Sequence, residues 1–154
     1  MKVLIADDQD SKQESLNDFM TSNYSNIIID KSYSFKGTRD KIIRNSFDLI
    51  LLDMTMPSFD SQPDKDNIVD GKNRALAGKD IIQTMVYRQI ISNVIIVTQF
   101  DVFGRHYQMT SIDEIIEPLV KDYPDIVKGY VLWDYQSDSW QANLLNIING
   151  LKND

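Results

Sequence analysis

Carboxylates and a hydroxyl follow three apolar segments of the sequence, and these side chains are the first candidates for chemistry. They are Asp7, Asp8, Asp53 and Thr98, which come directly after residues 3–6, 49–52 and 94–97. Unbroken apolar runs of this length are typical of central strands in a parallel sheet that helices cover on both faces. Ligands of such sheets bind beyond the carboxyl ends of the strands. If the three ends lie together, the four side chains form one acidic pocket.

The charges of such a pocket predict a cation. Two carboxylates about 4 Å apart repel each other by roughly 4 kcal/mol at an effective dielectric constant near 20. Asp7, Asp8 and Asp53 therefore cannot all stay ionised without a counter-ion, and Mg²⁺ is the natural one because it is a hard cation that binds carboxylate oxygens. Two simpler interpretations stay open: Asp53 only caps a turn, or the cluster only binds cations.

The same residues resemble the response-regulator receiver family. Asp7 and Asp8 match its acidic pair, Asp53 its phosphoacceptor in the Asp-x-x-Met-Pro signature, Thr98 its switch hydroxyl and Tyr130 its aromatic switch. The resemblance covers essentially the whole chain. It implies a flavodoxin-like, doubly wound α/β fold, in which five parallel strands lie in the order 2-1-3-4-5 with helices on both faces.

The resemblance also implies a function. A partner histidine kinase or phosphotransfer protein would pass a phosphoryl group to Asp53, and the chain would signal by protein contact as a stand-alone, cytoplasmic, bacterial two-component protein. Asp8 and Asp53 would bind Mg²⁺ directly, Asp7 through water, and Thr55 through its backbone carbonyl. Such a domain is not an enzyme, except that it catalyses its own phosphotransfer and dephosphorylation.

One position departs from the family pattern and keeps an alternative open. Receivers carry a lysine after the fifth strand that pairs with the phosphoryl oxygen, and this chain has Trp133 there. Lys128 precedes the expected strand over residues 129–133. A cation from one of two connections that are longer than in the family, described below, would have to substitute. The candidates are Lys65, Lys72, Lys79 and Arg105. The alternative is a pseudo-receiver, an interaction module whose output does not depend on phosphorylation.

Two connections are longer than the family norm. Residues 58–76 are polar and lack periodicity, which predicts a solvated, mobile insertion before a helix that enters at Ala77. Residues 98–129 contain Phe103 and Tyr107, aromatic side chains of the kind that anchor interfaces, and are expected to contact the downstream protein. Pro118 is expected to kink or split the helix in that region. Ser11 and Glu14 have capping-box spacing, which predicts that the first helix starts at Ser11.

Composition limits the remaining classes. A chain of 154 residues predicts one domain, residues 1–154, and no apolar run approaches the ~20 residues that span a bilayer. The absence of cysteine and the single histidine, His106, exclude thiol nucleophiles and sites with two imidazoles. A net charge of −7 argues against nucleic-acid binding. A haloacid-dehalogenase-like phosphatase is disfavoured because Thr55 stands where that family needs a second aspartate. A flavodoxin-like cofactor binder is disfavoured because no phosphate-binding loop follows the first strand.

Overall fold

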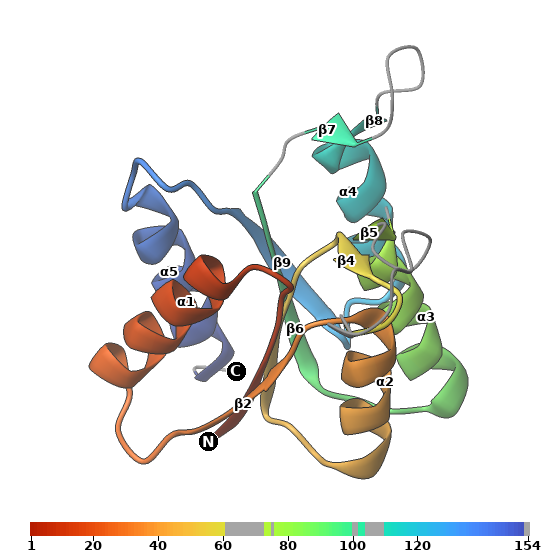
Figure 1. Cartoon of the computed structure of the whole chain (residues 1–154), viewed down its shortest axis with the longest axis horizontal. Helices are drawn as coiled ribbons and strands as arrows, with labels where there is room; N and C mark the ends of the chain where they lie inside the picture. The colour runs from red at the N-terminus through yellow and green to blue at the C-terminus, as the bar shows by residue number, and fades with distance from the viewer. Residues whose placement is uncertain (61–72, 75, 100–101, 104–109, 153–154) are drawn as a thin grey trace.

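A five-stranded parallel sheet forms the centre of the chain, as predicted (Figure 1). The structure is a computed structural model that describes residues 1–60, 73–74, 76–99, 102–103 and 110–152. The strand order is β2-β1-β3-β6-β9, which numbered along the sheet-forming strands is 2-1-3-4-5. These strands are β1 (Lys2–Ala6), β2 (Ile28–Ser32), β3 (Leu49–Leu52), β6 (Asn93–Thr98) and β9 (Val127–Leu132). β1 pairs with β3 in parallel, as predicted; an antiparallel pairing would have contradicted the predicted fold.

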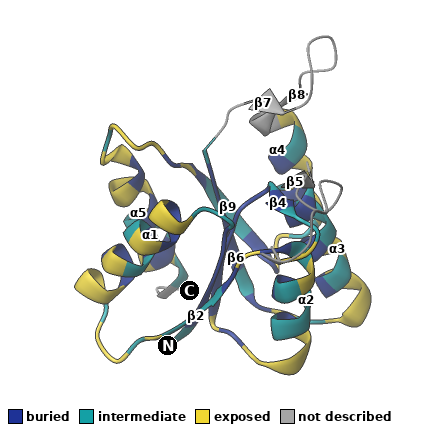
Figure 2. Cartoon of the chain, in the orientation of Figure 1, coloured by how far each residue is buried: buried dark blue, intermediate teal, exposed yellow. Residues whose placement is uncertain are grey.

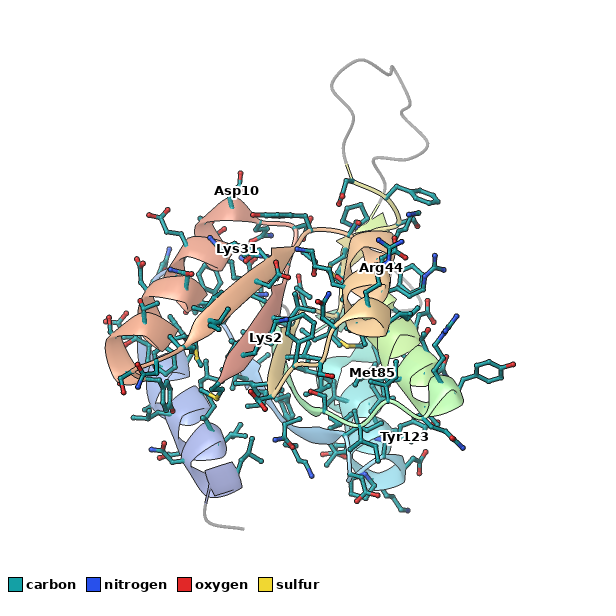
Figure 3. All side chains as sticks on the ribbon, turned by 90° about the horizontal axis from the view of Figure 1, so that it is seen from below. Lys2, Asp10, Lys31, Arg44, Met85 and Tyr123 are labelled. Carbon is teal, nitrogen blue, oxygen red and sulfur yellow. The ribbon has the colours of Figure 1, made fainter. Side chains whose placement is uncertain are left out.

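Helices cover both faces of the sheet because its central strands are apolar on both sides (Figure 2). The helices are α1 (Asp10–Asn23), α2 (Phe35–Arg44), α3 (Ala77–Arg88), α4 (Ile112–Asp122) and α5 (Ser139–Lys152). One core lies under α1 and α5, and the other under α2, α3 and α4. Figure 3 shows this division, with Asp10 of α1 on one side of the sheet and Arg44 of α2 and Met85 of α3 on the other.

The two long connections begin and end in short antiparallel pairs. β4 (Met56–Pro57) pairs with β5 (Asn73–Arg74), and β7 (Val102–Phe103) pairs with β8 (Thr110–Ser111). The predicted mobility of the first insertion falls mainly on residues 61–72, which lie outside the described residues. The first insertion therefore leaves and rejoins the domain through a paired base, and α3 begins at Ala77 as expected.

Two local predictions are wrong, and a third, that Pro118 kinks or splits its helix, is wrong as to the split. The first helix starts at Asp10, with Gln9 as its N-cap and no capping side chain, and the Ser11 hydroxyl bonds to the Tyr135 hydroxyl at 2.9 Å. Pro118 does not split α4, which runs through it. β9 begins at Val127 and so includes Lys128. Among the described residues, no helix is both long enough and apolar enough to cross a membrane.

Candidate functional site

The strand ladders bring Asp7 and Asp53 together at the carboxyl edge of the sheet. The backbone N–H of Asp53 donates to the Ala6 carbonyl at 2.9 Å, so Asp53 follows β3 directly beside Asp7, which follows β1. Asp7 and Asp53 are buried and Asp8 is half-buried. One carboxylate oxygen from each of the three lies within 4.8 Å of the others. The acidic pocket expected from the sequence therefore exists.

The other predicted site residues lie on neighbouring elements. Thr98 ends β6 and is 1% exposed, and its side chain hydrogen-bonds to Asp53. Thr55 is half-buried between β3 and β4, in the turn that follows Asp53. Tyr130 lies on β9 and packs against the core beneath α2, α3 and α4. Phe103 belongs to β7, and Tyr107 lies outside the described residues.

An ammonium group that the sequence reading missed lies inside the acidic pocket. Lys12 is 1% exposed, and its Nζ lies 2.6 Å from Asp7 Oδ2 and 3.5 Å from Asp53 Oδ1. The same ammonium donates to the Val97 carbonyl at 2.7 Å. A lysine is almost never fully buried without partners, and here two carboxylates and a carbonyl supply them.

The periodicity of α1 carried the missed signal. Leu16, Phe19 and Met20 mark the buried face of this helix, and Lys12 lies four residues before Leu16 on that same face. The capping-box interpretation used Ser11 and Glu14 and gave Lys12 no role. A lysine that continues an apolar stripe, four residues after an acidic pair, is the pattern that would have revealed it.

Gln13, the next residue, fixes the first turn of α1 against the strand ends. Its amide nitrogen lies 2.9 Å from each of three backbone carbonyls, those of Ile5, Asp7 and Ser32. Gln13 is buried, and these carbonyls belong to the edge where β1 and β2 end. The contact positions the start of α1, and with it Lys12, over the acidic pocket.

Burial and mutual repulsion perturb the acidity of the three carboxyls. Burial raises the pKa of Asp53 to about 7; the Lys12 ammonium and the Thr98 hydrogen bond oppose the rise, while the charges of Asp7 and Asp8 add to it. Burial also raises the pKa of Asp7, against the effect of Lys12. Burial and the charge of Asp7 raise the pKa of Asp8. One ammonium is therefore too little to offset three carboxylates.

A glycine lets α3 approach the turn after Asp53. The N–H of Gly78 donates to the Met54 carbonyl at 3.0 Å. A Cβ at Gly78 would lie 2.8 Å from the Asp53 carbonyl oxygen, which is backbone and cannot rotate away. The start of α3 is thus held against the turn that follows Asp53, despite the long insertion that precedes it.

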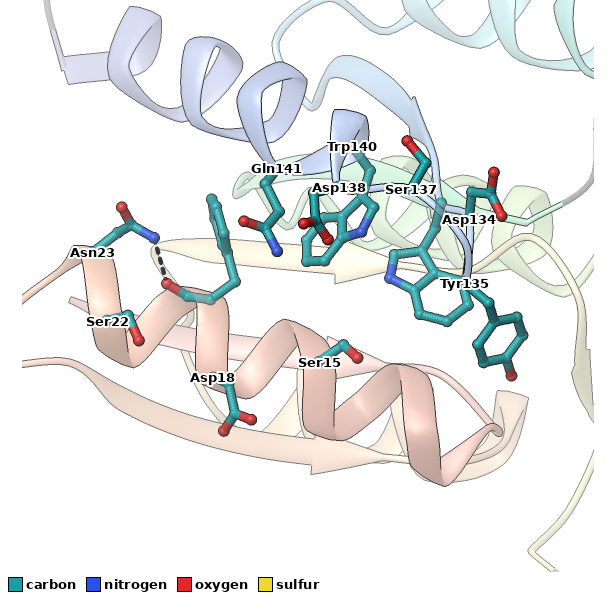
Figure 4. A pocket seen from close by; sticks show the side chains of 12 residues that line it. Ser15, Asp18, Ser22, Asn23, Asp134, Tyr135, Ser137, Asp138, Trp140 and Gln141 are labelled. Atoms are coloured by element: carbon teal, nitrogen blue, oxygen red, sulfur yellow. Dashed lines mark hydrogen bonds between the residues drawn. The ribbon is translucent and has the colours of Figure 1, made fainter.

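Trp133 packs among the aromatic side chains on the α1 and α5 side of the sheet. Its backbone N–H donates to the Thr98 carbonyl at 2.8 Å, but its indole is 3% exposed and contacts Tyr135 and Trp140. With Asp18, Asp134 and other residues it lines a surface pocket of about 350 Å³ between α1 and the segment before α5 (Figure 4).

The alternative cations of the sequence reading are not needed to place a positive charge at Asp53. Lys128 lies near the start of β9 and donates to the Pro124 carbonyl at 2.9 Å. Lys79 is half-buried in the first turn of α3, and Lys65, Lys72 and Arg105 lie outside the described residues. The cation that the described residues place beside Asp53 is Lys12 of α1, and the expectation that an insertion supplies one stays a prediction.

The donor set suits a hard divalent cation. Asp7, Asp8 and Asp53 offer only carboxylate oxygens, the ligands that Mg²⁺ prefers, and Asp8 is partly open to solvent. With all three ionised, the pocket and Lys12 together carry two units of negative charge, which one divalent cation offsets. The residues present therefore fit the ion.

The chain is similar to known proteins over nearly its whole length. No protein-family model matches the sequence. The chain is 47% identical over 152 residues to the Detocs response regulatory protein DtcB of Enterobacter cloacae, covering 98% of this chain and 100% of that protein.

Solved receiver structures share the fold. The response regulator domain of Thermotoga maritima CheB has a TM-score of 0.65 at 17% identity, covering 100% of this chain and 97% of that one. Thermotoga maritima response regulator TrrA, in complex with Mg²⁺-BeF, has a TM-score of 0.58 at 16% identity, covering 95% and 97%. These likenesses agree on the fold, and the identity to DtcB extends over nearly the whole of both chains. The chain therefore belongs to the response regulators and has the fold of a CheY-like receiver domain.

Proposed function

We propose that this chain accepts a phosphoryl group on Asp53 from a histidine kinase or phosphotransfer protein and passes the signal on by protein contact. The observation that carries the proposal is the position of the Asp53 carboxylate. It lies at the carboxyl edge of the sheet, between two further carboxylates, the Thr98 hydroxyl and a buried ammonium. The proposed role is that of a signalling module and not of an enzyme that acts on a metabolite.

Each side chain has a part in the proposed transfer. The Asp53 carboxylate is the nucleophile, and the turn held by Gly78 fixes its direction. Asp7 and Asp8, with Asp53 and the Thr55 carbonyl, are proposed to hold Mg²⁺, which supplies positive charge that stabilises the transferred phosphoryl group. Thr98, whose hydroxyl interacts with Asp53, is proposed to bond to a phosphoryl oxygen, and Tyr130 is proposed to act as the aromatic switch. The Mg²⁺-BeF complex of TrrA supports this assignment by analogy.

The pKa of Asp53 favours one alternative function. At about 7, this pKa leaves a large share of Asp53 protonated at neutral pH when no metal is bound, and a protonated carboxyl is a poor nucleophile. A pseudo-receiver that signals without phosphorylation therefore stays a second candidate. In that case the region of residues 98–129, with α4, would still be the surface proposed for the downstream protein.

Intact-mass measurement separates the two functions. The chain is incubated with acetyl phosphate, with and without Mg²⁺, and an Asp53→Asn variant serves as the control. We expect the mass to rise by one phosphoryl group in the presence of Mg²⁺ only, and not in the variant. No gain in mass at any pH between 6 and 9 would support the pseudo-receiver.

A further inference from the structure

The Lys12 ammonium lies beside the carboxylate that the proposed function phosphorylates. We propose that Lys12, from the first turn of α1, is the cation that pairs with the phosphoryl oxygens on Asp53. The proposal rests on the phosphoryl transfer proposed above, and it assigns a contact of the transferred group to a side chain of α1, which was not among the cations expected from the sequence.

The geometry of the ammonium leaves one donor for the phosphoryl group. A lysine ammonium has three N–H donors. Two short contacts hold it in place: an ion pair with Asp7 Oδ2 at 2.6 Å and a hydrogen bond to the Val97 carbonyl at 2.7 Å. The contact to Asp53 Oδ1, at 3.5 Å, is the longest of the three. The donor on this side is therefore the one that an oxygen built onto Asp53 can take.

The charge of the pocket requires more than a divalent cation after transfer. Before transfer, the three carboxylates and Lys12 carry two units of negative charge, as given above. Phosphorylation replaces the single charge of Asp53 by the two charges of an acyl phosphate. Without Lys12, a divalent ion would face four negative charges in a buried site, where solvent screens little. Lys12 is already present and needs no movement to offset one of them.

The chemical step balances without a proton from Lys12. An Oδ atom of Asp53 attacks phosphorus and forms the new O–P bond. The bond from phosphorus to the donor's leaving atom breaks, and that atom keeps the electron pair; it is the acetate oxygen of acetyl phosphate or the imidazole nitrogen of a phosphohistidine. Lys12 stays charged throughout and contributes an N–H donor and a positive charge.

The test compares Lys12→Gln with wild type in the full chain. Glutamine keeps an N–H donor for the Val97 carbonyl but removes the charge. Initial rates of phosphorylation by acetyl phosphate with Mg²⁺ are followed by intact mass, and we expect a decrease of about tenfold to a hundredfold, the range of a charged hydrogen bond. Lys36→Gln, which changes an exposed ammonium paired with Asp40 on α2, is the matched control and should leave the rate unchanged.

A second readout distinguishes phosphoryl contact from an effect on the metal. Calorimetry of Mg²⁺ binding without phosphodonor should give an equal or tighter affinity in Lys12→Gln, because a like charge has left the site. Slower phosphorylation with lost Mg²⁺ binding would overturn the proposal, since the metal would then explain the rate.

A third comparison removes the possibility that Lys12 only neutralises Asp7. In an Asp7→Asn background, position 7 carries no charge, so Lys12→Gln does not leave an unpaired buried carboxylate there. The comparison therefore also avoids the main risk to folding, which is an uncompensated buried charge. We expect the rate to fall again when Lys12 is changed in this background. An unchanged rate there would assign Lys12 to Asp7 alone and overturn the proposal. A wild-type chain that is never phosphorylated would instead refute the proposed function itself.

Discussion

The buried charge of Asp53 predicts that Asp53→Asn stabilises the metal-free protein, and increasingly so as the pH rises. The folded-state pKa of about 7 lies above the ordinary value of 3.8, so the folded protein holds a proton that the unfolded chain has lost between these two values. Wild-type stability must therefore fall with rising pH in this window, because the folded state binds more protons there. Asparagine has the shape of the neutral carboxyl and does not titrate.

The magnitude follows from the two pKa values. At pH 5 the folded carboxyl is almost fully protonated, whereas the unfolded carboxyl, with its pKa of 3.8, is mostly ionised, and this difference gives the variant an advantage of about 2 kcal/mol. At pH 8 both states are ionised and the advantage reaches about 4 kcal/mol. Well below pH 3.8 the Asp53 carboxyl of wild type is neutral in the folded and the unfolded state, and the advantage of the variant should approach zero. The pairing of Lys12 with Asp7 at 2.6 Å remains in the variant, so the substitution leaves no orphaned ammonium.

Urea unfolding at pH 5 and pH 8, with a chelator present, measures the difference. Asp125→Asn, at an exposed turn before β9, is the control for removing a carboxylate and should change stability equally at both pH values. Added Mg²⁺ should stabilise wild type more than Asp53→Asn and so reduce the advantage at pH 8. A constant advantage, or one below about 1 kcal/mol at pH 8, would mean that Asp53 is solvated and that the charge argument for the pocket is wrong.

Three further predictions concern the framework of the site. Gly78→Ala should lower the free energy of unfolding by about 1–3 kcal/mol and slow phosphorylation, because its Cβ would meet the Asp53 carbonyl. Gly150→Ala is the control: it has open space around it in α5 and should be stabilising in the same urea titration. Gln13→Leu should lower the free energy of unfolding by about 1–3 kcal/mol, since it removes two N–H donors that three buried carbonyls share, although the Ser32 carbonyl still accepts from the Asp7 N–H. An effect below about 1 kcal/mol would mean that water replaces the amide. Trp133→Lys should lower the free energy of unfolding by about 3–5 kcal/mol, because it removes a buried indole. It should not speed phosphorylation in the mass assay, because the Lys12 ammonium already lies beside Asp53. A faster rate would show that the site still lacks a cation.

The order and direction of the strands could be predicted because the sequence is locally consistent. Residues 49–52 and 94–97 are apolar on both faces, which only a central, covered strand tolerates, and parallel pairing then places Asp53 beside Asp7. The start of α3 at Ala77 was also predictable, since a helical pattern resumes there after a polar segment. Patterns of this kind report on local structure and on burial, and the sheet topology follows from both.

The cation of the site could not be predicted in the same way. Its position depends on how α1 approaches the strand ends, and that depends on Gln13, whose three carbonyl contacts come from the ends of two strands, β1 and β2. The capping-box spacing of Ser11 and Glu14 competed with the stripe that includes Lys12, and tertiary packing decided in favour of the stripe. The helix is not split at Pro118 for a related reason, since a proline in a helix is tolerated when packing holds the turns on either side.

The tryptophan at position 133, where the family pattern has a lysine, and the buried Lys12 of α1 are two parts of one arrangement. Trp133 fills the space between α1 and α5 with an indole, and α1 supplies the charge that position 133 lacks. A side chain in the first turn of a helix points back toward the helix N-terminus, and for Lys12 this direction is toward the strand ends. The Tyr135 hydroxyl, which contacts the side chains of Ser11 and Gln9 at 2.9 Å and 3.1 Å, ties the segment after β9 to the same turn. A new charge on Asp53 would therefore act on α1 directly through Lys12, in addition to its effect on Thr98, and the segment before α5 is joined to the helix that receives it.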